Sequence, residues 1–272
     1  MKKNILITGA LGYIGTELCK LYSGFSWKYD VVAIDNRFIS ERVNELKRRK
    51  IKFIQADILN INEIKTHIQK AEIVHHLAGI TDVAYVKKEA DKSKDDLTAK
   101  VAIEGTANVL NSMNPNATIV FPSTHVVFEG LKEKKENVDE NEKTNTFLAY
   151  STSKVENENQ IINSGKKYAI FRLGSVYGFS TDTMRINIMP NLFSKIASQN
   201  GKIKLFGGGV QLKSLVPLID VARCFKFVEE SNDFKNGIYN LTKDNVTVKD
   251  VADLCKKINP KLEITLTDDE IP

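Results

Sequence analysis

Short apolar runs alternate with helix-like segments through the first two-thirds of the chain. Each run is largely continuous, without a regular alternation of apolar and polar residues. Strands that are buried on both faces have this pattern, and they form parallel sheets that are covered by helices. The six predicted strands are Asn4–Thr8, Asp30–Ile34, Ile51–Gln55, Glu72–Leu77, Ala117–Phe121 and Lys167–Arg172.

Helical patterns occupy intervals between these strands. We expect helices up to about Tyr22 and near Glu41–Lys50, Asp95–Met113 and Ala149–Asn163. This alternation predicts an α/β fold, a doubly wound parallel sheet of the Rossmann type with right-handed connections. Ligands of such sheets bind at the carboxyl ends of the strands, and we expect the candidate chemistry there.

The pattern becomes less regular after about Gly178. This part of the chain predicts a smaller region that caps the edge of the sheet. Its expected strands are Ile203–Phe206 and Ser214–Pro217, and its expected helices are Ile188–Ser198, Val221–Glu230 and Val248–Ile258.

Composition narrows the class of protein. Hydrophobic residues make up 42% and charged residues 27% of the 272 positions, as in globular domains. No apolar run has the length of a membrane span, and the first residues do not resemble a secretory signal, so we expect no membrane partner. Cys19, Cys224 and Cys255 are odd in number and far apart, which favours the reducing cytoplasm over a disulfide framework.

Charge and histidine placement exclude two further kinds of site. The net charge of +5 comes from 39 Lys and Arg against 34 Asp and Glu, and the lysines are scattered. Nucleic-acid binding needs a clustered patch or a known module, so we expect no nucleic-acid partner. His75 and His76 are neighbours on a predicted strand and point to opposite faces, so we expect no metal site.

A glycine-rich turn, Thr8–Gly15, joins the first strand to the first helix. Gly9, Gly12 and Gly15 allow a tight turn, a close approach of a pyrophosphate, and close packing of helix on strand. The helix N-terminus then offers free N–H groups to the phosphates. Small residues often merely pack a helix on a sheet, but the strand–turn–helix context favours dinucleotide binding.

Asp35 ends the second strand, about twenty residues after the turn. A carboxylate there accepts hydrogen bonds from the adenosine ribose and repels a 2′-phosphate, which favours NAD over NADP. Arg37 weakens that preference, because its side chain could reach such a phosphate.

Tyr150 and Lys154 are four residues apart at the start of a predicted helix and therefore share a face. A tyrosine at its ordinary pKa is a poor base at neutral pH, but a neighbouring ammonium favours the phenolate. This pair can take a proton from a hydroxyl while hydride leaves the same carbon for nicotinamide.

The spacing Gly-x-x-Gly-x-x-Gly resembles the extended short-chain dehydrogenase/reductase family. Asp57-Ile58 is similar to the family's adenine-contacting pair, and His76–Gly79 is similar to its His-Leu-Ala-Ala element. Together the matching motifs span roughly residues 4–260. The resemblance implies an NAD site formed by Gly9, Gly12, Tyr13, Ile14, Gly15, Asp35, Asn36, Asp57, Ile58, Leu77, Ala78, Gly79, Ser123, Tyr150 and Lys154.

The same resemblance implies a hydroxyl residue that binds the reacting oxygen. In the family pattern this hydroxyl residue lies four residues before a tyrosine. Phe128 replaces that tyrosine here, so Thr124 is assigned the role, and Ser123 is the alternative. His125 follows directly and is a candidate substrate contact, although packing or surface exposure is the more common role of such a residue. Glu129 has the position of an insertion in the family pattern.

Downstream residues are similar to the substrate half of the sugar-nucleotide 4-epimerase group. Ser175, Asn187 and Lys213 match positions that bind a nucleotide-diphosphate sugar, with Ser175 in place of the usual Asn and Lys213 in place of Arg. We therefore expect an NAD-binding domain over residues 1–178 and a mainly substrate-binding region over 179–272, interleaved with it. Asp220 is expected to cap the next helix.

The motifs also limit the reaction. The 4,6-dehydratases that this chain resembles have Asp-Glu after the active-site threonine, whereas this chain has His125-Val126. The Cys and His residues of C3/C5 epimerases are also missing. These differences favour redox chemistry at one sugar carbon, C4: 4-epimerisation first, a C4 dehydrogenase or ketoreductase second, and a 4,6-dehydratase or a non-catalytic NAD-binding protein last.

The family resemblance raises two further expectations. It implies a homodimer formed through the helices near Asp95–Met113 and Ala149–Asn163. The chain ends at Pro272, earlier than members of the group usually do. Either a C-terminal part is absent or the segment that covers the substrate is shortened.

Overall fold

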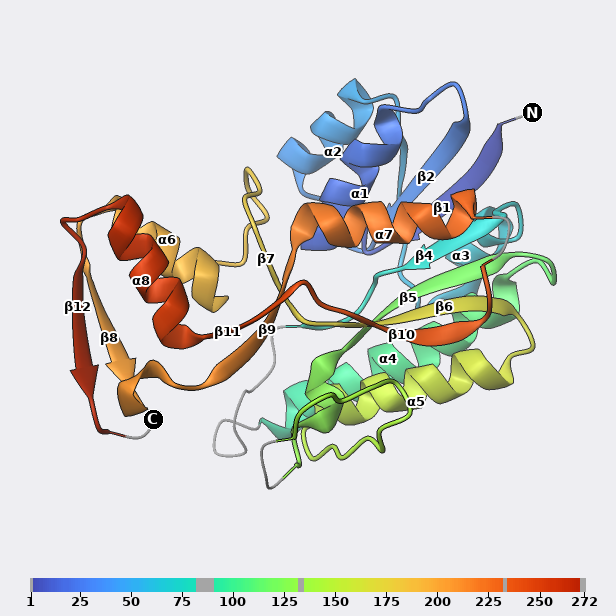
Figure 1. Cartoon of the computed structure of the whole chain (residues 1–272). Coiled ribbons are helices and arrows are strands. Elements are labelled where there is room, and N and C mark those ends of the chain that lie inside the picture. The colour runs from blue at the N-terminus through green and yellow to red at the C-terminus, as the bar shows by residue number, and fades with distance from the viewer. Residues whose placement is uncertain (1, 82–90, 132–134, 232–233, 270–272) are drawn as a thin grey trace. The chain divides into compact units, whose positions relative to one another are not determined.

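The computed structural model describes residues 2–81, 91–131, 135–231 and 234–269 (Figure 1). The chain divides into two compact units. The first contains Met1–Arg172 and Ala222–Asn240, and the second contains Leu173–Val221 and Leu241–Pro272. Pro272, at the chain end, lies outside the described residues.

A seven-stranded sheet forms the centre of the first unit. Its strand order is β10-β6-β5-β4-β1-β2-β3, and β1 pairs in parallel with both β2 and β4. This is the order of a doubly wound sheet with one strand added at the edge, as the sequence predicts. The strands are β1 (Lys3–Thr8), β2 (Tyr29–Asp35), β3 (Lys52–Gln55), β4 (Ile73–His76), β5 (Thr118–Thr124), β6 (Lys167–Leu173) and β10 (Gly237–Leu241).

The fifth strand is longer than the apolar pattern predicts. It continues past Phe121 through Pro122 to Thr124, although proline has no N–H for a strand ladder. Pairing with β4 ends at Val120, so Pro122 loses no ladder hydrogen bond on that side. Ser123 and Thr124 therefore belong to the strand itself.

Helices cover both faces of this sheet. They are α1 (Tyr13–Ser23), α2 (Ser40–Arg48), α3 (Ile61–Ile68), α4 (Lys92–Ser112), α5 (Ala149–Asn163) and α7 (Leu218–Glu230). No helix is predicted from the sequence over the residues of α3. A local signal for it exists, because the Asn60 side chain accepts a hydrogen bond from the Asn62 amide as an N-cap.

Two adjacent histidines show which helices lie on which face. The Tyr22 hydroxyl of α1 bonds His75 Nε2 at 2.8 Å, and the Phe225 ring of α7 stacks on His75. His76 Nε2 instead bonds the Thr106 hydroxyl of α4 at 3.0 Å. The two side chains thus point to opposite faces, as the sequence predicts, with α1 and α7 on one side and α4 on the other.

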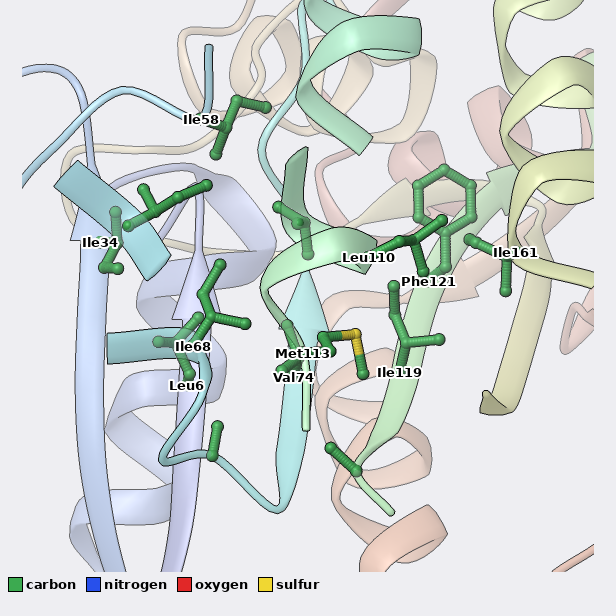
Figure 2. Close-up of a cluster of buried hydrophobic side chains, with 14 of the residues drawn as sticks. Leu6, Ile34, Ile58, Ile68, Val74, Leu110, Met113, Ile119, Phe121 and Ile161 are labelled. Atoms are coloured by element: carbon green, nitrogen blue, oxygen red, sulfur yellow. The ribbon is translucent and has the colours of Figure 1, made fainter. Parts of the chain in front are cut away.

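The main core lies on the α4 side of the sheet (Figure 2). Leu6, Ile34, Val74 and Ile119 project from four neighbouring strands. Side chains of the helices fill the space above them, and burial of this apolar surface is the main driving force for docking the helices. They are Ile64, Ile68, Val109, Leu110 and Ile161.

The second unit contains two small sheets and a separate core. One sheet has the order β11-β9-β7 and the other pairs β12 with β8. A cluster that includes Phe193, Leu205 and Cys255 forms its core. The elements are β7 (Ser175–Tyr177), α6 (Met189–Ser198), β8 (Lys202–Phe206), β9 (Leu212–Pro217), β11 (Asp244–Thr247), α8 (Val248–Ile258) and β12 (Glu263–Thr267).

The predicted N-cap role of Asp220 is wrong. The helix α7 begins two residues earlier, at Leu218, so Asp220 lies inside its first turn. Its carboxylate lies 3.6 Å from the Lys243 ammonium. An acidic side chain in a first turn still stabilises the helix through the helix dipole.

Two observations bear on membrane contact and cysteine pairing. Within the described ranges, no helix is long and apolar enough to cross a membrane. Cys19, Cys224 and Cys255 all lie in these ranges, and all three are free thiols.

Two phenylalanines on α7 give a matched test of the packing. Phe225 is fully buried, whereas Phe227 is 60% exposed. Phe225→Ala should lower the free energy of unfolding by about 3–5 kcal/mol, because it leaves a cavity between α7 and the sheet. Phe227→Ala should change it by no more than about 0.5 kcal/mol. Urea unfolding followed by circular dichroism measures both, and equal effects would contradict this packing.

Candidate active site

The glycine turn connects β1 to α1 at the edge where the strands end. The Ala10 amide donates to Ile34 O at 3.1 Å, and the Gly12 amide donates to Gly9 O at 3.0 Å. The turn is therefore tied to β2 and to itself. Gly12 is the N-cap of α1 and brings no side chain to the helix N-terminus, which suits the binding of an anion such as a pyrophosphate.

Only glycine fits at the first position of the turn. Gly9 has a φ of +66°, and a Cβ atom there would lie 2.7 Å from Ala78 N and from Leu77 C. A Cβ atom on Gly15 would lie 2.4 Å from Gly9 O. The turn after β1 thus contacts both α1 and the segment after β4. Since β1 and β4 are where the strand order reverses, this is the expected ligand position of a doubly wound sheet.

The Asp35 carboxylate lies beside the same turn. Its Oδ2 accepts from the Leu11 amide at 3.0 Å, and its Oδ1 accepts from Arg37 Nε at 3.0 Å. Asp35 is 5% exposed, so the carboxylate is held in a fixed place at the end of β2. Arg37 is engaged by Asp35, and this ion pair raises the pKa of the guanidinium.

Asn36 and Asp57 meet where β2 and β3 end. Asn36 Nδ2 donates to Asp57 Oδ2 at 3.1 Å, and Asp57 Oδ1 accepts from the Leu59 amide at 2.9 Å. Ile58 is placed differently, because its side chain is buried in the main core. A Cβ atom on Gly105 of α4 would lie 2.4 Å from Ile58 Cδ1, which shows how closely the two pack.

A chain of buried hydrogen bonds connects the glycine turn to α4 and α5. Thr8 Oγ1 bonds His76 Nδ1 at 2.9 Å, and His76 Nε2 bonds Thr106 Oγ1 at 3.0 Å. Asn157 Nδ2 of α5 then donates to Thr106 Oγ1 at 3.1 Å. Burial lowers the pKa of His76 to about 3, and the Lys154 charge acts in the same direction, so His76 is neutral at physiological pH.

Tyr150 and Lys154 lie on one face of α5, as their spacing predicts. The Lys154 ammonium is 5.9 Å from the centre of the Tyr150 ring. It donates to Pro122 O at 2.7 Å and lies 4.3 Å from the centre of the Phe121 ring. The lysine therefore connects the start of α5 to the end of β5. Burial lowers its pKa to about 8, and the Glu158 charge opposes that shift.

Thr124 and Ser123 have different environments at the end of β5. Thr124 Oγ1 accepts from the Val126 amide at 3.2 Å and begins the short 3₁₀ turn His125–Phe128. The Ser123 hydroxyl donates to the Glu158 carboxylate. Both side chains are buried, and the Ser123 hydroxyl contacts α5 through Glu158.

Glu158 is a residue of this region that the sequence analysis missed. Its carboxylate accepts from Arg172 Nε at 3.1 Å and from the second Arg172 nitrogen, Nη2, at 2.8 Å. Both side chains are at least 96% buried, and a buried bidentate pair fixes its partners firmly. The signal in the sequence was an acidic residue four positions after Lys154 on the same helix.

Of the predicted substrate residues, Thr124 and His125 lie in the first unit, and Ser175, Asn187 and Lys213 lie in the second. Ser175 in β7 is in register with Leu215 of β9, so Ser175 and Lys213 lie on one face of this strand pair. Asn187 is exposed and precedes α6. The nearby Asn191, which the sequence analysis missed, accepts from the Gly178 amide at 2.9 Å and donates to Arg185 O at 3.0 Å.

Sequence comparison decides the family. The profile of the NAD dependent epimerase/dehydratase family matches residues 5–242. The chain belongs to this family.

Two curated relatives are similar over most of their length. A Methanocaldococcus jannaschii protein named "Putative UDP-glucose 4-epimerase" is 29% identical over 93% of this chain and 81% of its own length. The N-acetyl-alpha-D-glucosaminyl-diphospho-ditrans,octacis-undecaprenol 4-epimerase of Escherichia coli O157:H7 is 25% identical over 96% of this chain and 74% of its own.

Solved structures share the fold. UDP-glucuronic acid 4-epimerase from Bacillus cereus, in complex with UDP-glucuronic acid and NAD, superposes with a TM-score of 0.80 at 24% identity. UDP-glucose 4-epimerase from Thermotoga maritima, with UDP-glucose, has a TM-score of 0.81 at 23% identity. Each match covers 98% of this chain and 86% of the other.

NAD is the cofactor of this epimerase/dehydratase family member, and the residues of the first unit fit it. The turn at Gly9 and Gly12 is open to a pyrophosphate at the N-terminus of α1. The Asp35 carboxylate is placed for a ribose, with Arg37 paired to it. In the part of the chain that the structure describes, no cluster of three or more His, Cys, Asp or Glu side chains could hold a metal ion.

The Lys154 environment predicts an alkaline limit on activity. The charged form of Lys154 favours the Tyr150 phenolate, and that charge is lost as the pH rises past the Lys154 pKa of about 8. We expect kcat/KM to fall above about pH 8, by up to about tenfold per pH unit. Glu158→Gln removes the charge that raises the Lys154 pKa, and it should move the limit to lower pH.

The control is Glu156→Gln, which removes an exposed carboxylate from the same helix. Glu156→Gln should have the same alkaline limit on kcat/KM as the unaltered protein. A profile that is flat from pH 7 to about pH 10 would contradict the role of the lysine charge.

Proposed function

We propose that this protein catalyses 4-epimerisation of a nucleotide-linked sugar. The observation that carries the proposal is the juxtaposition of Tyr150 and Lys154 with the hydroxyl-bearing end of β5. The names of the relatives from M. jannaschii and E. coli point to the same reaction. Membership of an NAD-dependent family supplies the redox cofactor that the reaction requires.

In this proposal Tyr150 removes the proton from the C4 hydroxyl. NAD, held by the glycine turn and Asp35, would supply the hydride acceptor for oxidation at C4 and the hydride donor for reduction of the ketone from its other face. Lys154 holds a positive charge near the tyrosine ring and favours the phenolate. Thr124 donates its hydroxyl proton to the reacting oxygen, since its oxygen already accepts from Val126. The Ser123 hydroxyl is committed to Glu158, which favours Thr124 over Ser123 for this contact.

The remaining predicted site residues keep their proposed roles. The glycine turn binds the pyrophosphate of NAD, Asp35 binds the adenosine ribose, Asp57 contacts the adenine, and Asn36 is a further cofactor contact. Ser175, Asn187 and Lys213, all in the second unit, bind the sugar nucleotide, and His125 is a further candidate contact. Lys213 offers a point charge to a diphosphate without the bidentate geometry of arginine. We therefore propose the first unit as the NAD-binding part and the second as mainly the substrate-binding part.

A C4 dehydrogenase or ketoreductase is the second candidate. It would use the same Tyr150 and Lys154 and would release the keto-sugar or consume it. The absence of an acid–base pair beside Thr124 in the sequence, where His125-Val126 stands, argues against 4,6-dehydration.

Two further properties are proposed with it. We propose a homodimer through α4 and α5, supported by the exposed apolar side chains of Leu97, Ile103 and Ile162. A single monomeric species in sedimentation velocity at micromolar concentration would contradict it.

We propose a cytoplasmic location, because the three cysteines are free thiols. Recovery of the native protein from a secreted or periplasmic fraction would contradict that.

The reaction is tested with UDP-, dTDP- and GDP-sugars and with a sugar diphospho-undecaprenol. We expect the C4 epimer to form without net NADH. Tyr150→Phe should lower kcat by about 10²- to 10⁴-fold and leave NAD affinity within about threefold, because it removes only the acid–base hydroxyl. Stoichiometric NADH would favour the dehydrogenase. Failure to turn over any sugar would overturn the proposal.

A further inference from the structure

Glu129 connects the threonine segment to the tyrosine helix. It directly follows the 3₁₀ turn His125–Phe128, which begins at Thr124. Its Oε1 accepts from the Phe147 amide at 2.9 Å and from the Leu148 amide at 2.8 Å, and the Ser151 hydroxyl donates to it as well. One carboxylate oxygen therefore gathers three donors around the start of α5.

The helix has no acidic side chain and no side-chain N-cap of its own at this place. Leu148 is its N-cap and has an apolar side chain, and the first turn contains no acidic residue. An N-cap position usually holds Ser, Thr, Asp or Asn, and a negative charge near a helix N-terminus is stabilising. Glu129 supplies the accepting oxygen that the N-cap residue lacks, from a different segment of the chain.

The backbone beside Glu129 fixes the two segments to each other. The Asn145 amide donates to Val127 O at 2.8 Å, and the Gly130 amide donates to Asn145 O at 2.8 Å. Asn145 Nδ2 also donates to Gly130 O at 2.9 Å. The segment that starts at Thr124 and the segment that enters α5 thus run together, with Glu129 at their junction.

This placement couples two groups of the proposed mechanism. Tyr150 lies in the helix turn that Glu129 holds, and its neighbour Ser151 is fully buried. Thr124 lies at the other end of the same short segment as Glu129. A shift of the first turn of α5 would move the tyrosine hydroxyl relative to the threonine hydroxyl, and a displacement of about 1 Å can cost about 100-fold in rate.

We infer that Glu129 is a positioning residue that sets Tyr150 against Thr124. The inference rests on the proposed function for the identity of the two groups. The contacts of Glu129 with the start of α5 do not depend on that function. Glu129 acts by accepting hydrogen bonds from the Phe147 and Leu148 amides. An uncharged side chain of the same length that accepts these bonds should therefore hold the helix start equally well.

Three variants test this role: Glu129→Ala, Glu129→Gln and the control Glu156→Ala, which truncates an exposed acidic residue of the same helix. Glu129→Ala should lower kcat by about 10- to 100-fold. It should leave the KM for the sugar and the Kd for NAD within about threefold. Glu129→Gln keeps the accepting oxygen and should restore kcat to within about threefold of the unaltered protein. Glu156→Ala should behave as the unaltered protein does.

Amide hydrogen exchange of the peptide over residues 147–154 provides a readout that needs no turnover. Glu129→Ala should speed exchange there, whereas Glu129→Gln and Glu156→Ala should not. If the unaltered protein acts on no sugar, the proposed function fails, yet this exchange result still tests the positioning role.

Three results would overturn the inference. One is unchanged exchange and kcat in Glu129→Ala. Another is a loss of kcat in Glu129→Gln equal to that in Glu129→Ala. The third is a loss confined to NAD affinity or KM, which a role in binding the ligands would produce.

Discussion

The contact between the turn after β1 and the segment after β4 is the constraint on which the site depends. Gly9 lies so close to Leu77 and Ala78 that no side chain fits between them. The contact brings the N-terminus of α1 to the point where the strand order reverses. A dinucleotide needs this helix end for its pyrophosphate and the neighbouring strand ends for its two nucleosides, so the cofactor position follows from one close approach.

Buried polar groups carry that constraint to the catalytic helix. Thr8, at the end of β1, is connected through His76 and Thr106 to Asn157 of α5. Three residues earlier on the same helix, Lys154 donates to Pro122 O near the end of β5. Buried hydrogen bonds are costly to leave unmade, so these links hold α5 at a defined place relative to the glycine turn. Tyr150 is positioned by this arrangement and by the contacts of Glu129.

Local sequence was sufficient for the elements that carry strong periodicity or strong turn chemistry. The sequence alone predicts the six strands, the glycine turn and the shared helix face of Tyr150 and Lys154. The strands are predicted because burial on both faces gives continuous apolar runs. The shared face is predicted because residues four apart lie on the same side of a helix. Strands β7, β11 and β12 are short and partly exposed, so their patterns are weak. Their existence depends on partners far along the chain, such as β9 for β7.

The contacts of single polar residues could not be derived in the same way. Glu129 reads as an insertion in a motif, and its hydrogen bonds to Phe147 and Leu148 exist only because the intervening chain folds back. Glu158 similarly meets Ser123 and Arg172 only when β5, β6 and α5 are assembled. Such pairings depend on tertiary structure, which neither spacing nor propensity encodes.

In the proposed reaction C4 loses a hydride and then regains the same hydride within one turnover. The most direct test uses a sugar nucleotide that the protein epimerises, labelled with deuterium at C4, in ordinary water with unlabelled NADH added. We expect the epimeric product to retain the deuterium at C4. Loss of the label to solvent or to the added cofactor would contradict it.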